Sequence, residues 1–220
     1  MTVLVLLGAP GAGKGTQATV LEEQLGIPHL ASGDLLRAAV GQRTPVGIEA
    51  DRFMSRGQLV PDQTMIRLFL DRLAQPDAAG GAVLDGFPRT RPQAEALDKA
   101  LAERGARVDR ALLIDVPIED LVRRAAGRRI CESSGHVYHL AANPPQVAGV
   151  CDIDASPLIQ REDDREETIR ARMDQQLGAM RDVVGFYRSK GILDTVDGRQ
   201  AINEVSDSLL AALGPAKGVA

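Results

Sequence analysis

The feature that most constrains the fold of this chain is a glycine-rich loop placed directly after a short apolar run. The run covers residues 3–7, and the loop, residues 8–16, reads Gly-Ala-Pro-Gly-Ala-Gly-Lys-Gly-Thr. Glycines let successive backbone N–H groups point inward, because no Cβ blocks a ligand and positive φ costs little. A helix beginning near Lys14 adds unpaired N–H donors and partial positive charge. The pattern predicts a strand, a phosphate-binding loop and a helix, and a ligand-free turn is the alternative.

The position of the hydroxyl in this loop narrows the class of phosphate-binding protein. The general pattern places Ser or Thr directly after the lysine, where its hydroxyl holds Mg²⁺. Here Gly15 follows Lys14, and the hydroxyl comes one residue later, at Thr16. The loop therefore resembles that of the nucleoside monophosphate kinases more than that of GTPases or motor ATPases.

Short apolar runs alternate with stretches of helical character along most of the chain. The expected strands are residues 3–7, 27–31, 82–84, 111–116 and 192–196. The expected helices are residues 16–25, 34–40, 46–56, 62–74, 119–129 and 163–188. Continuous apolar runs suit strands that are covered on both faces, and the alternation implies right-handed crossovers. We therefore expect an α/β fold with a five-stranded parallel sheet and helices on both faces.

Two segments do not follow this alternation. Residues 32–75 contain helical stretches without a strand, and residues 130–160 lack helical periodicity and are rich in Gly, Pro and Asn. A structureless loop of that length is uncommon in a compact domain. We therefore expect two inserted subdomains, one helical and one a small β-structure.

Composition and charge limit the function classes. Hydrophobic residues make up 44% of the chain and aromatic residues only 3%, so the expected core is mostly aliphatic. The net charge of −4 argues against general nucleic-acid binding, which favours a basic surface. The first apolar run is too short for a signal peptide, no stretch reaches membrane-spanning length, and two cysteines make no disulfide framework. We expect a cytoplasmic protein that contacts neither nucleic acid nor membrane.

A second motif follows the third expected strand. Residues 84–90 read Leu-Asp-Gly-Phe-Pro-Arg-Thr, and ligands of open α/β sheets bind beyond the carboxyl ends of the strands. Asp85 is suited to orienting magnesium-bound water, and the guanidinium of Arg89 can grip a phosphate through two parallel donors. The alternative is a simple tight turn, since Asp, Gly and Pro all favour turns.

Further segments complete a recognisable pattern. Residues 32–37 read Ser-Gly-Asp-Leu-Leu-Arg, residues 57–62 read Gly-Gln-Leu-Val-Pro-Asp, and Gln93 follows. With the two motifs above, the chain resembles the adenylate kinases from residue 2 to about residue 212. The resemblance implies a monomeric enzyme that uses Mg²⁺ and reversibly transfers a phosphoryl group from ATP to AMP, giving two ADP.

The resemblance also implies domain boundaries. They are 1–30, 61–126 and 165–220 for the core, 31–60 for an AMP-binding insertion and 127–164 for a lid of the family's long form. Water is the competing acceptor, so hinged closure of the lid and the insertion would protect the reaction.

The residues that the resemblance implies come from all three domains. The AMP site would comprise Ser32, Arg37, Gln58, Leu59, Val60, Gly86, Phe87, Pro88, Arg89, Gln93, Arg161 and Arg172. The ATP site would comprise Gly11, Ala12, Gly13, Lys14, Gly15, Thr16, Arg124, Val137, Tyr138 and Gln200. The catalytic cations would be Lys14, Arg89, Arg128, Arg161 and Arg172. The hydrogen-bonding capacity of Gln93 supports its assignment to the AMP site, because a primary amide can donate and accept a hydrogen bond along the edge of adenine.

Arginines and acidic residues in and beside the expected lid allow two interpretations. Arg124 and Arg128 are four apart in the expected helix 119–129 and would share a face. They are either phosphate ligands, as the resemblance implies, or solvated charges. The buried side of that helix is expected to carry Leu121, Val122, Ala125 and Ala126. Asp163 and Asp164 either tether the closed lid or stabilise a helix N-terminus.

The lid carries a candidate metal site. Long-lid members of the family often hold structural Zn²⁺ with two C-x₂-C pairs, and others have a hydrogen-bonded polar cluster instead. The corresponding positions here are Cys131, Ser134, Cys151 and Asp154. Serine is a poor zinc ligand, so His136 or His139 would supply the fourth position if zinc binds. Three states remain open: a zinc site, a metal-free polar cluster, and a disulfide.

Three other functions are weighed against the leading one. A kinase for UMP, CMP or GMP would share most of these motifs. A nucleotide-sensing module without turnover predicts loss of Lys14 or of a clamp arginine, and all are present. A partner-coupled ATPase predicts a hydroxyl at position 15, which is glycine.

Overall fold

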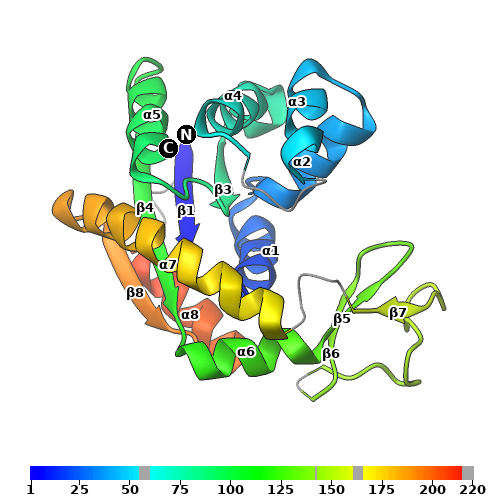
Figure 1. Ribbon diagram of the computed structural model, residues 1–220. Helices are drawn as coiled ribbons and strands as arrows, with labels where there is room; N and C mark the ends of the chain where they lie inside the picture. The colour runs from blue at the N-terminus through cyan, green and yellow to red at the C-terminus, as the bar shows by residue number, and fades with distance from the viewer. Residues whose placement is uncertain (55–59, 142, 161–165, 215–220) are drawn as a thin grey trace. The chain divides into compact units, whose positions relative to one another are not determined.

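The computed structural model describes residues 1–54, 60–141, 143–160 and 166–214, with the backbone alone for residues 125 and 166–176. The chain separates into two compact units (Figure 1). The first comprises Met1–Gly8, Gly13–Asp115 and Gly178–Ala220, and the second Ala9–Ala12 and Val116–Leu177. In the described part of the chain, no helix is both long enough and apolar enough to cross a membrane.

The first unit is built on a five-stranded sheet with the strand order β2-β3-β1-β4-β8. Its strands are β1 (Thr2–Leu7), β2 (His29–Ala31), β3 (Gly81–Asp85), β4 (Val108–Asp115) and β8 (Leu193–Asp197). Every neighbouring pair is parallel, which confirms the predicted fold class. The register pairs Asp85 with both Leu6 and Ala31, so three strands end at one edge of the sheet.

Helices cover the strands of the first unit. They are α1 (Lys14–Leu25), α2 (Ser32–Gly41), α3 (Pro45–Met54), α4 (Asp62–Leu73), α5 (Arg91–Ala102) and α8 (Ile202–Ala212). A 3-10 turn, η1 (Pro76–Ala78), precedes β3, and the long helix α7 (Glu166–Ser189) precedes β8. As predicted, no strand occurs among the described residues between β2 and β3.

Alternation along β1 divides the core into two layers. Val3, Val5 and Leu7 pack in one cluster with Phe69 of α4 and Leu97 of α5, together with the end of α7. Successive strand side chains point to opposite faces, so the fully buried Leu4 and Leu6 face the other layer. There α1 contacts both β1 and α8, and Ser206 donates a hydrogen bond to Gln17. A mostly aliphatic core therefore packs on both faces of the sheet and fixes the position of the strand ends.

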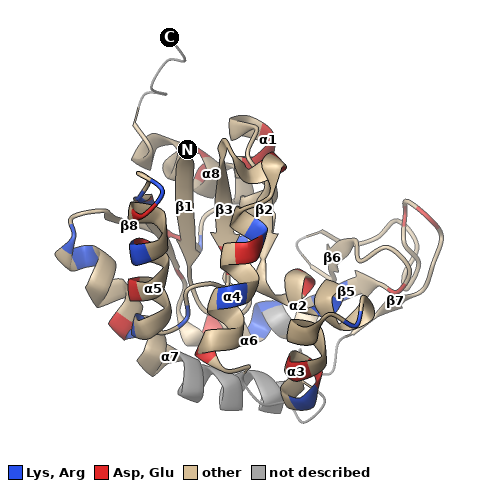
Figure 2. Cartoon of the chain, turned by 90° about the horizontal axis from the view of Figure 1, so that it is seen from above, with Lys and Arg blue, Asp and Glu red and all other residues tan. Residues whose placement is uncertain are grey.

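Charged residues of both signs are interspersed on the helices of the first unit (Figure 2). Arg91 pairs with Glu95 one turn further along α5, and Lys190 pairs with Asp98. Exposed pairs of this kind contribute little to stability, because water and salt screen them.

The second unit contains α6 (Ile118–Gly127) and a small antiparallel sheet. The sheet has the order β6-β5-β7 and is formed by β5 (Arg128–Cys131), β6 (Val137–His139) and β7 (Leu158–Ile159). This is the small β-structure that the sequence predicts between residues 130 and 160.

The predicted helix 119–129 was too long. α6 ends at Gly127, and Arg128 begins β5 by pairing with His139, so Arg124 and Arg128 do not share a helix face. A Cβ built at position 127 would lie 2.5 Å from the imidazole of His139, so glycine there lets the His139 side chain approach the end of α6. Leu121 and Val122 are buried as predicted. Ala126 is exposed, because the helix ends one residue later.

Tyr187 allows a test of core packing in the first unit. Its side chain is fully buried, and its hydroxyl has no hydrogen-bond partner among the described residues. Burial, with a smaller contribution from Asp98, raises the pKa of Tyr187 far above its usual value. Tyr187→Phe removes this unpaired polar group, so we expect the free energy of unfolding to rise by about 1 kcal/mol in urea denaturation.

The control for Tyr187→Phe is a buried hydroxyl that has a partner. Thr64 is 2% exposed and donates to Glu49 over 2.8 Å. Thr64→Val should therefore lower the free energy of unfolding by about 1 kcal/mol. A loss of stability in Tyr187→Phe comparable to that in Thr64→Val would contradict the assignment of an unpaired hydroxyl.

Candidate active site

The phosphate-loop lysine begins a helix, as predicted. Lys14 is the first residue of α1, and its ammonium group donates to the carbonyl of Gly8 over 2.9 Å. Gly13, which precedes it, has φ +95°, and no side chain caps the helix. The first N–H groups of α1 are therefore not used by a capping side chain and suit an anion.

Asp85 lies at the carboxyl end of β3, near the start of α1. A Cβ built on Gly15 would lie 3.8 Å from its Oδ2, so glycine there leaves room beside the carboxylate. Burial raises the pKa of Asp85, but contact with His29 and the charges of Lys14 and Arg89 outweigh it, so the pKa lies below its usual value. Asp85 is therefore ionised at neutral pH, as a residue that orients metal-bound water must be.

His29 is a neighbour of Asp85 to which the sequence analysis assigned no role. Its Nε2 lies 3.4 Å from Oδ2 of Asp85, and both side chains are mostly buried. His29 lies two positions before Ala31, which pairs with Asp85, so the contact depends on the β2–β3 register. No local sequence signal predicts it.

Arg89 is held in a defined orientation by two neutral groups. Its Nε donates to the carbonyl of Gly86 over 2.8 Å, and a terminal nitrogen donates to the hydroxyl of Ser32 over 2.9 Å. Ser32 is 3% exposed and begins α2, so the contact joins the β3–α5 turn to the helical segment. A planar guanidinium held in this way suits a phosphate group.

Arg37 has a different environment from Arg89. It is exposed on α2 and pairs with Asp34, at 2.5 Å, one turn earlier in the same helix. The structure therefore brings Ser32, Arg89 and Gly86 together but places Arg37 in a local surface ion pair.

Gln93 contacts Arg89, and its side chain is buried, with 3% of the residue exposed. Its amide oxygen accepts from the backbone N–H of Arg89 over 2.7 Å, and its amide nitrogen donates to Asp62 over 2.7 Å. Thr90 also donates to Asp62, over 2.8 Å. A buried amide with two fixed partners is held in one orientation.

Two predicted nucleotide ligands have side chains in the core. Phe87 is fully buried and stacks on Phe69, with ring centroids 4.2 Å apart. Tyr138 is 6% exposed, and its hydroxyl accepts from the N–H of Asp152 over 2.8 Å. Any contact that Phe87 or Tyr138 makes with a nucleotide would therefore come from its backbone.

The other predicted site residues have varied environments. Pro88 is buried, Val60, Arg124 and Arg128 are half-buried, and Thr16, Val137 and Gln200 are exposed. Ala12 is buried in the loop, where its N–H donates to the carbonyl of Ala9. Several predictions fall outside the described residues or side chains: Gln58, Leu59, Arg161, Asp163, Asp164 and the side chain of Arg172.

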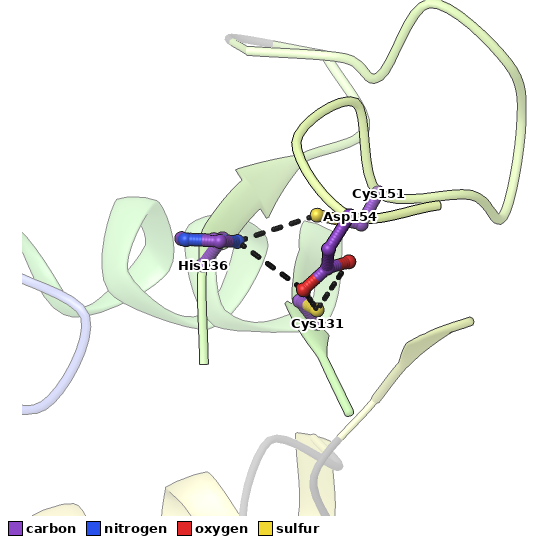
Figure 3. A group of neighbouring side chains, drawn as sticks. All are labelled: Cys131, His136, Cys151 and Asp154. Carbon is purple, nitrogen blue, oxygen red and sulfur yellow. Dashed lines mark hydrogen bonds and ion pairs between the residues drawn. The ribbon is translucent and has the colours of Figure 1, made fainter. Parts of the chain in front are cut away.

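Four side chains of the second unit form a compact cluster (Figure 3). The ligand atoms of Cys131, His136, Cys151 and Asp154 all lie within 4.8 Å of one another. Sγ of Cys131 is 3.2 Å from Asp154, and Nδ1 of His136 is 3.4 Å from Sγ of Cys151 and 3.9 Å from Asp154. Ligands of a tetrahedral zinc ion stand about 3.3–3.8 Å apart, given its usual bond lengths. The residues present therefore fit Zn²⁺.

The structure distinguishes the candidates for the fourth position in this cluster. His136 belongs to it, whereas the Nδ1 atom of His139 accepts from the N–H of Ala141. The hydroxyl of Ser134 donates to Asp154 and thus supports a ligand. Both cysteines are free thiols in the structure.

Hydrogen bonds favour the charged forms of two members of the cluster. Donors from Ser134 and the backbone of Ser156 hold the pKa of Asp154 well below its usual range. Burial raises the pKa of the Cys151 thiol, but hydrogen bonds from Tyr138, nearby backbone N–H groups and His136 outweigh it, so the pKa is lowered. A thiolate and a carboxylate are the forms that bind a metal.

Together, the parallel sheet, the glycine-rich loop and the lysine at the start of α1 define a phosphate-binding α/β protein. The family model for adenylate kinase matches residues 6–192. An adenylate kinase of Clostridium perfringens strain SM101 is 50% identical over 214 residues, which cover 97% of this chain and 99% of the relative. Those of Exiguobacterium sibiricum and Thermodesulfovibrio yellowstonii are each 49% identical, covering 96% of this chain and 98% of each relative. The chain belongs to the adenylate kinase family.

Proposed function

We propose that this chain catalyses the reversible, Mg²⁺-dependent transfer of the terminal phosphoryl group of ATP to AMP, giving two ADP. The observation that carries the proposal is the charge arrangement at one edge of the sheet. Asp85 ends β3 beside the start of α1, since a Cβ on Gly15 would lie 3.8 Å from its Oδ2, and the charges of Lys14 and Arg89 lower its pKa. This arrangement suits a polyphosphate with its metal ion.

The chemistry requires little beyond positioning and charge. Phosphoryl transfer passes through a loose transition state with charge spread over the moving group, so fixed cations stabilise it without a general base. Lys14 would bind the outer phosphates of ATP, and Arg89 the phosphate of AMP. Asp85 would hold Mg²⁺ through its water shell, with Thr16 nearby, and the ion would neutralise phosphate charge.

The remaining roles extend the same proposal. Residues 31–60 would bind AMP, and residues 127–164 would form a lid that closes to exclude water. Arg128, Arg161 and Arg172 would complete the cationic ring around the transferred group. We also propose that the protein acts as a cytoplasmic monomer.

The test is a comparison of acceptors at saturating ATP and Mg²⁺. We expect kcat/KM for AMP to exceed that for GMP, CMP and UMP by about 100-fold or more, because a site built to hydrogen-bond one base rejects others. ADP should be the only product, in a two-to-one ratio to the AMP consumed. Steady ATP hydrolysis without an acceptor would support an ATPase instead, and binding without turnover a sensing module.

We further propose that the lid cluster holds a structural Zn²⁺ with Cys131, His136, Cys151 and Asp154 as ligands. Three residues of this unit, Cys131, Tyr138 and Cys151, form its small buried cluster, with Leu158 packed against them. The described residues of this subdomain form little core, so a metal would stabilise it. The proposal assigns zinc no part in phosphoryl transfer.

Metal analysis tests this proposal directly. Protein purified without chelators should contain about one zinc per chain, and His136→Ala should lose most of it, because one of four ligands is gone. His139→Ala is the matched control and should keep its zinc, since His139 lies outside the cluster. Less than about a tenth of an equivalent in the unmodified protein would contradict zinc binding and favour a polar cluster.

A further inference from the structure

Three side chains form a closed hydrogen-bond network between the start of α4 and the β3–α5 turn. Asp62 accepts from the amide nitrogen of Gln93 through Oδ1 and from the hydroxyl of Thr90 through Oδ2, over 2.7 and 2.8 Å. Thr90 is the N-cap of α5 and accepts from the backbone N–H of Gln93 over 3.3 Å. The hydroxyl hydrogen of Thr90 is thus committed to Asp62, and both carboxylate oxygens are used.

The partners of Gln93 determine which way its amide points. The backbone N–H of Arg89 can only donate, and the carboxylate of Asp62 can only accept. Rotating the amide by half a turn would set its oxygen against a carboxylate and its NH₂ group against an N–H. Both hydrogen bonds would then be replaced by repulsive contacts. The network therefore fixes the positions of donor and acceptor on this amide.

An amide in a fixed orientation distinguishes purines by the order of hydrogen-bond donor and acceptor along the edge of the base. With two of its hydrogen-bonding positions occupied, Gln93 keeps one N–H and one oxygen lone pair for a ligand. Adenine presents an acceptor next to an exocyclic NH₂ donor, whereas guanine presents a carbonyl acceptor next to an N–H donor in the reverse order. An amide that could rotate would pair with either base, and one that cannot rotate matches only one of them.

We propose that Asp62 is a specificity-determining positioning residue, which locks the amide of Gln93 in the orientation that matches adenine and excludes guanine. The inference rests on the proposed function, in which Gln93 contacts the base of the acceptor nucleotide. Asp62 does not touch the reacting phosphates and acts only through Gln93.

Asp62→Asn tests this inference, because it keeps the shape of the side chain but can either donate or accept. We expect the ratio of kcat/KM for AMP to that for GMP to fall about tenfold or more, with the loss for AMP appearing in KM more than in kcat. Thr90→Ser keeps both hydroxyl hydrogen bonds and should retain the ratio of the unmodified protein. If Asp62 were merely structural, kcat/KM would fall equally for both acceptors, which would overturn the inference.

Two further variants extend the test, and the first keeps it decisive if Asp62→Asn folds poorly. Asp62→Glu can still only accept, so the AMP-to-GMP ratio should stay high even where both rates fall. In a Gln93→Met background, Asp62→Asn should not change the ratio further, because the residue acts through the amide. A large additional change there would overturn the inference. Absence of ADP formation by the unmodified protein would instead contradict the proposed function.

Discussion

Replacing Lys14 by alanine is expected to lower kcat by about two to three orders of magnitude, while the affinity for AMP changes little. A fixed cation aimed at charge that develops in the transition state has an effect of this size on kcat. Lys14 begins α1 and its ammonium group is held by the carbonyl of Gly8, so its position is defined before reaction. Arg89 and Ser32, the proposed AMP ligands, are held by each other and by the carbonyl of Gly86.

The measurement combines initial rates of ADP formation with calorimetric titration of AMP. Lys99→Ala is the matched control, since Lys99 is exposed on α5 and has no assigned role. Its kcat should equal that of the unmodified protein. A Lys14→Ala variant with the same kcat as Lys99→Ala would remove the basis for the proposed mechanism.

Gly86→Ala is expected to raise KM for AMP by about tenfold to 100-fold. A Cβ at this position would lie 2.4 Å from the hydroxyl of Ser32 and 3.1 Å from the guanidinium of Arg89, so both would have to move. A shift of about 1 Å in groups that position a substrate costs up to about 100-fold in rate. The φ of +74° at Gly86 adds a backbone cost of about 1–2 kcal/mol for any L-residue.

Gly80→Ala is the control for this substitution. Gly80 is exposed one residue before β3, and a Cβ there would meet no atom within 4 Å. It should show the AMP kinetics of the unmodified protein, and thermal melts of both variants separate folding from binding. Unaltered KM for AMP in a folded Gly86→Ala protein would show that the Ser32–Arg89 pair does not bind the acceptor.

The sheet could be predicted because its signals are local. All five runs of apolar residues became strands, and the glycine-rich loop placed the start of α1 near Lys14. β2 is shorter than expected and begins at His29, directly after Pro28, whose carbonyl already accepts from the N–H of Val83. The order of the strands follows from pairing over long distances in sequence and was not predicted.

Two helix boundaries differ from those predicted, one because of a local signal and one because of a tertiary contact. α5 had no predicted range, although Thr90 caps it and Pro92 occupies its first turn, a combination typical of a helix start. The predicted extension of α6 through Arg129 failed because Arg128 and Arg129 pair across strands with His139 and Tyr138, which outweighs helical periodicity there. A tertiary contact of this kind leaves no local signal.

The proposed ligands could be named from motifs, but the groups that orient them could not. Asp62 belongs to a motif that the sequence analysis quoted, yet its contact with Gln93 spans 31 residues of sequence. The contact of His29 with Asp85 spans 56 residues. These contacts depend on the register of the folded chain, so only the structure supplies them.

In the proposed mechanism ATP and AMP bind together, with their phosphates facing each other within one ring of cations. The most direct test is titration with a bisubstrate mimic in which two adenosines are joined by five phosphates. A compound that spans both subsites should bind with a Kd about 100-fold or more below that of either nucleotide alone. A Kd no lower than that of ATP would contradict the account.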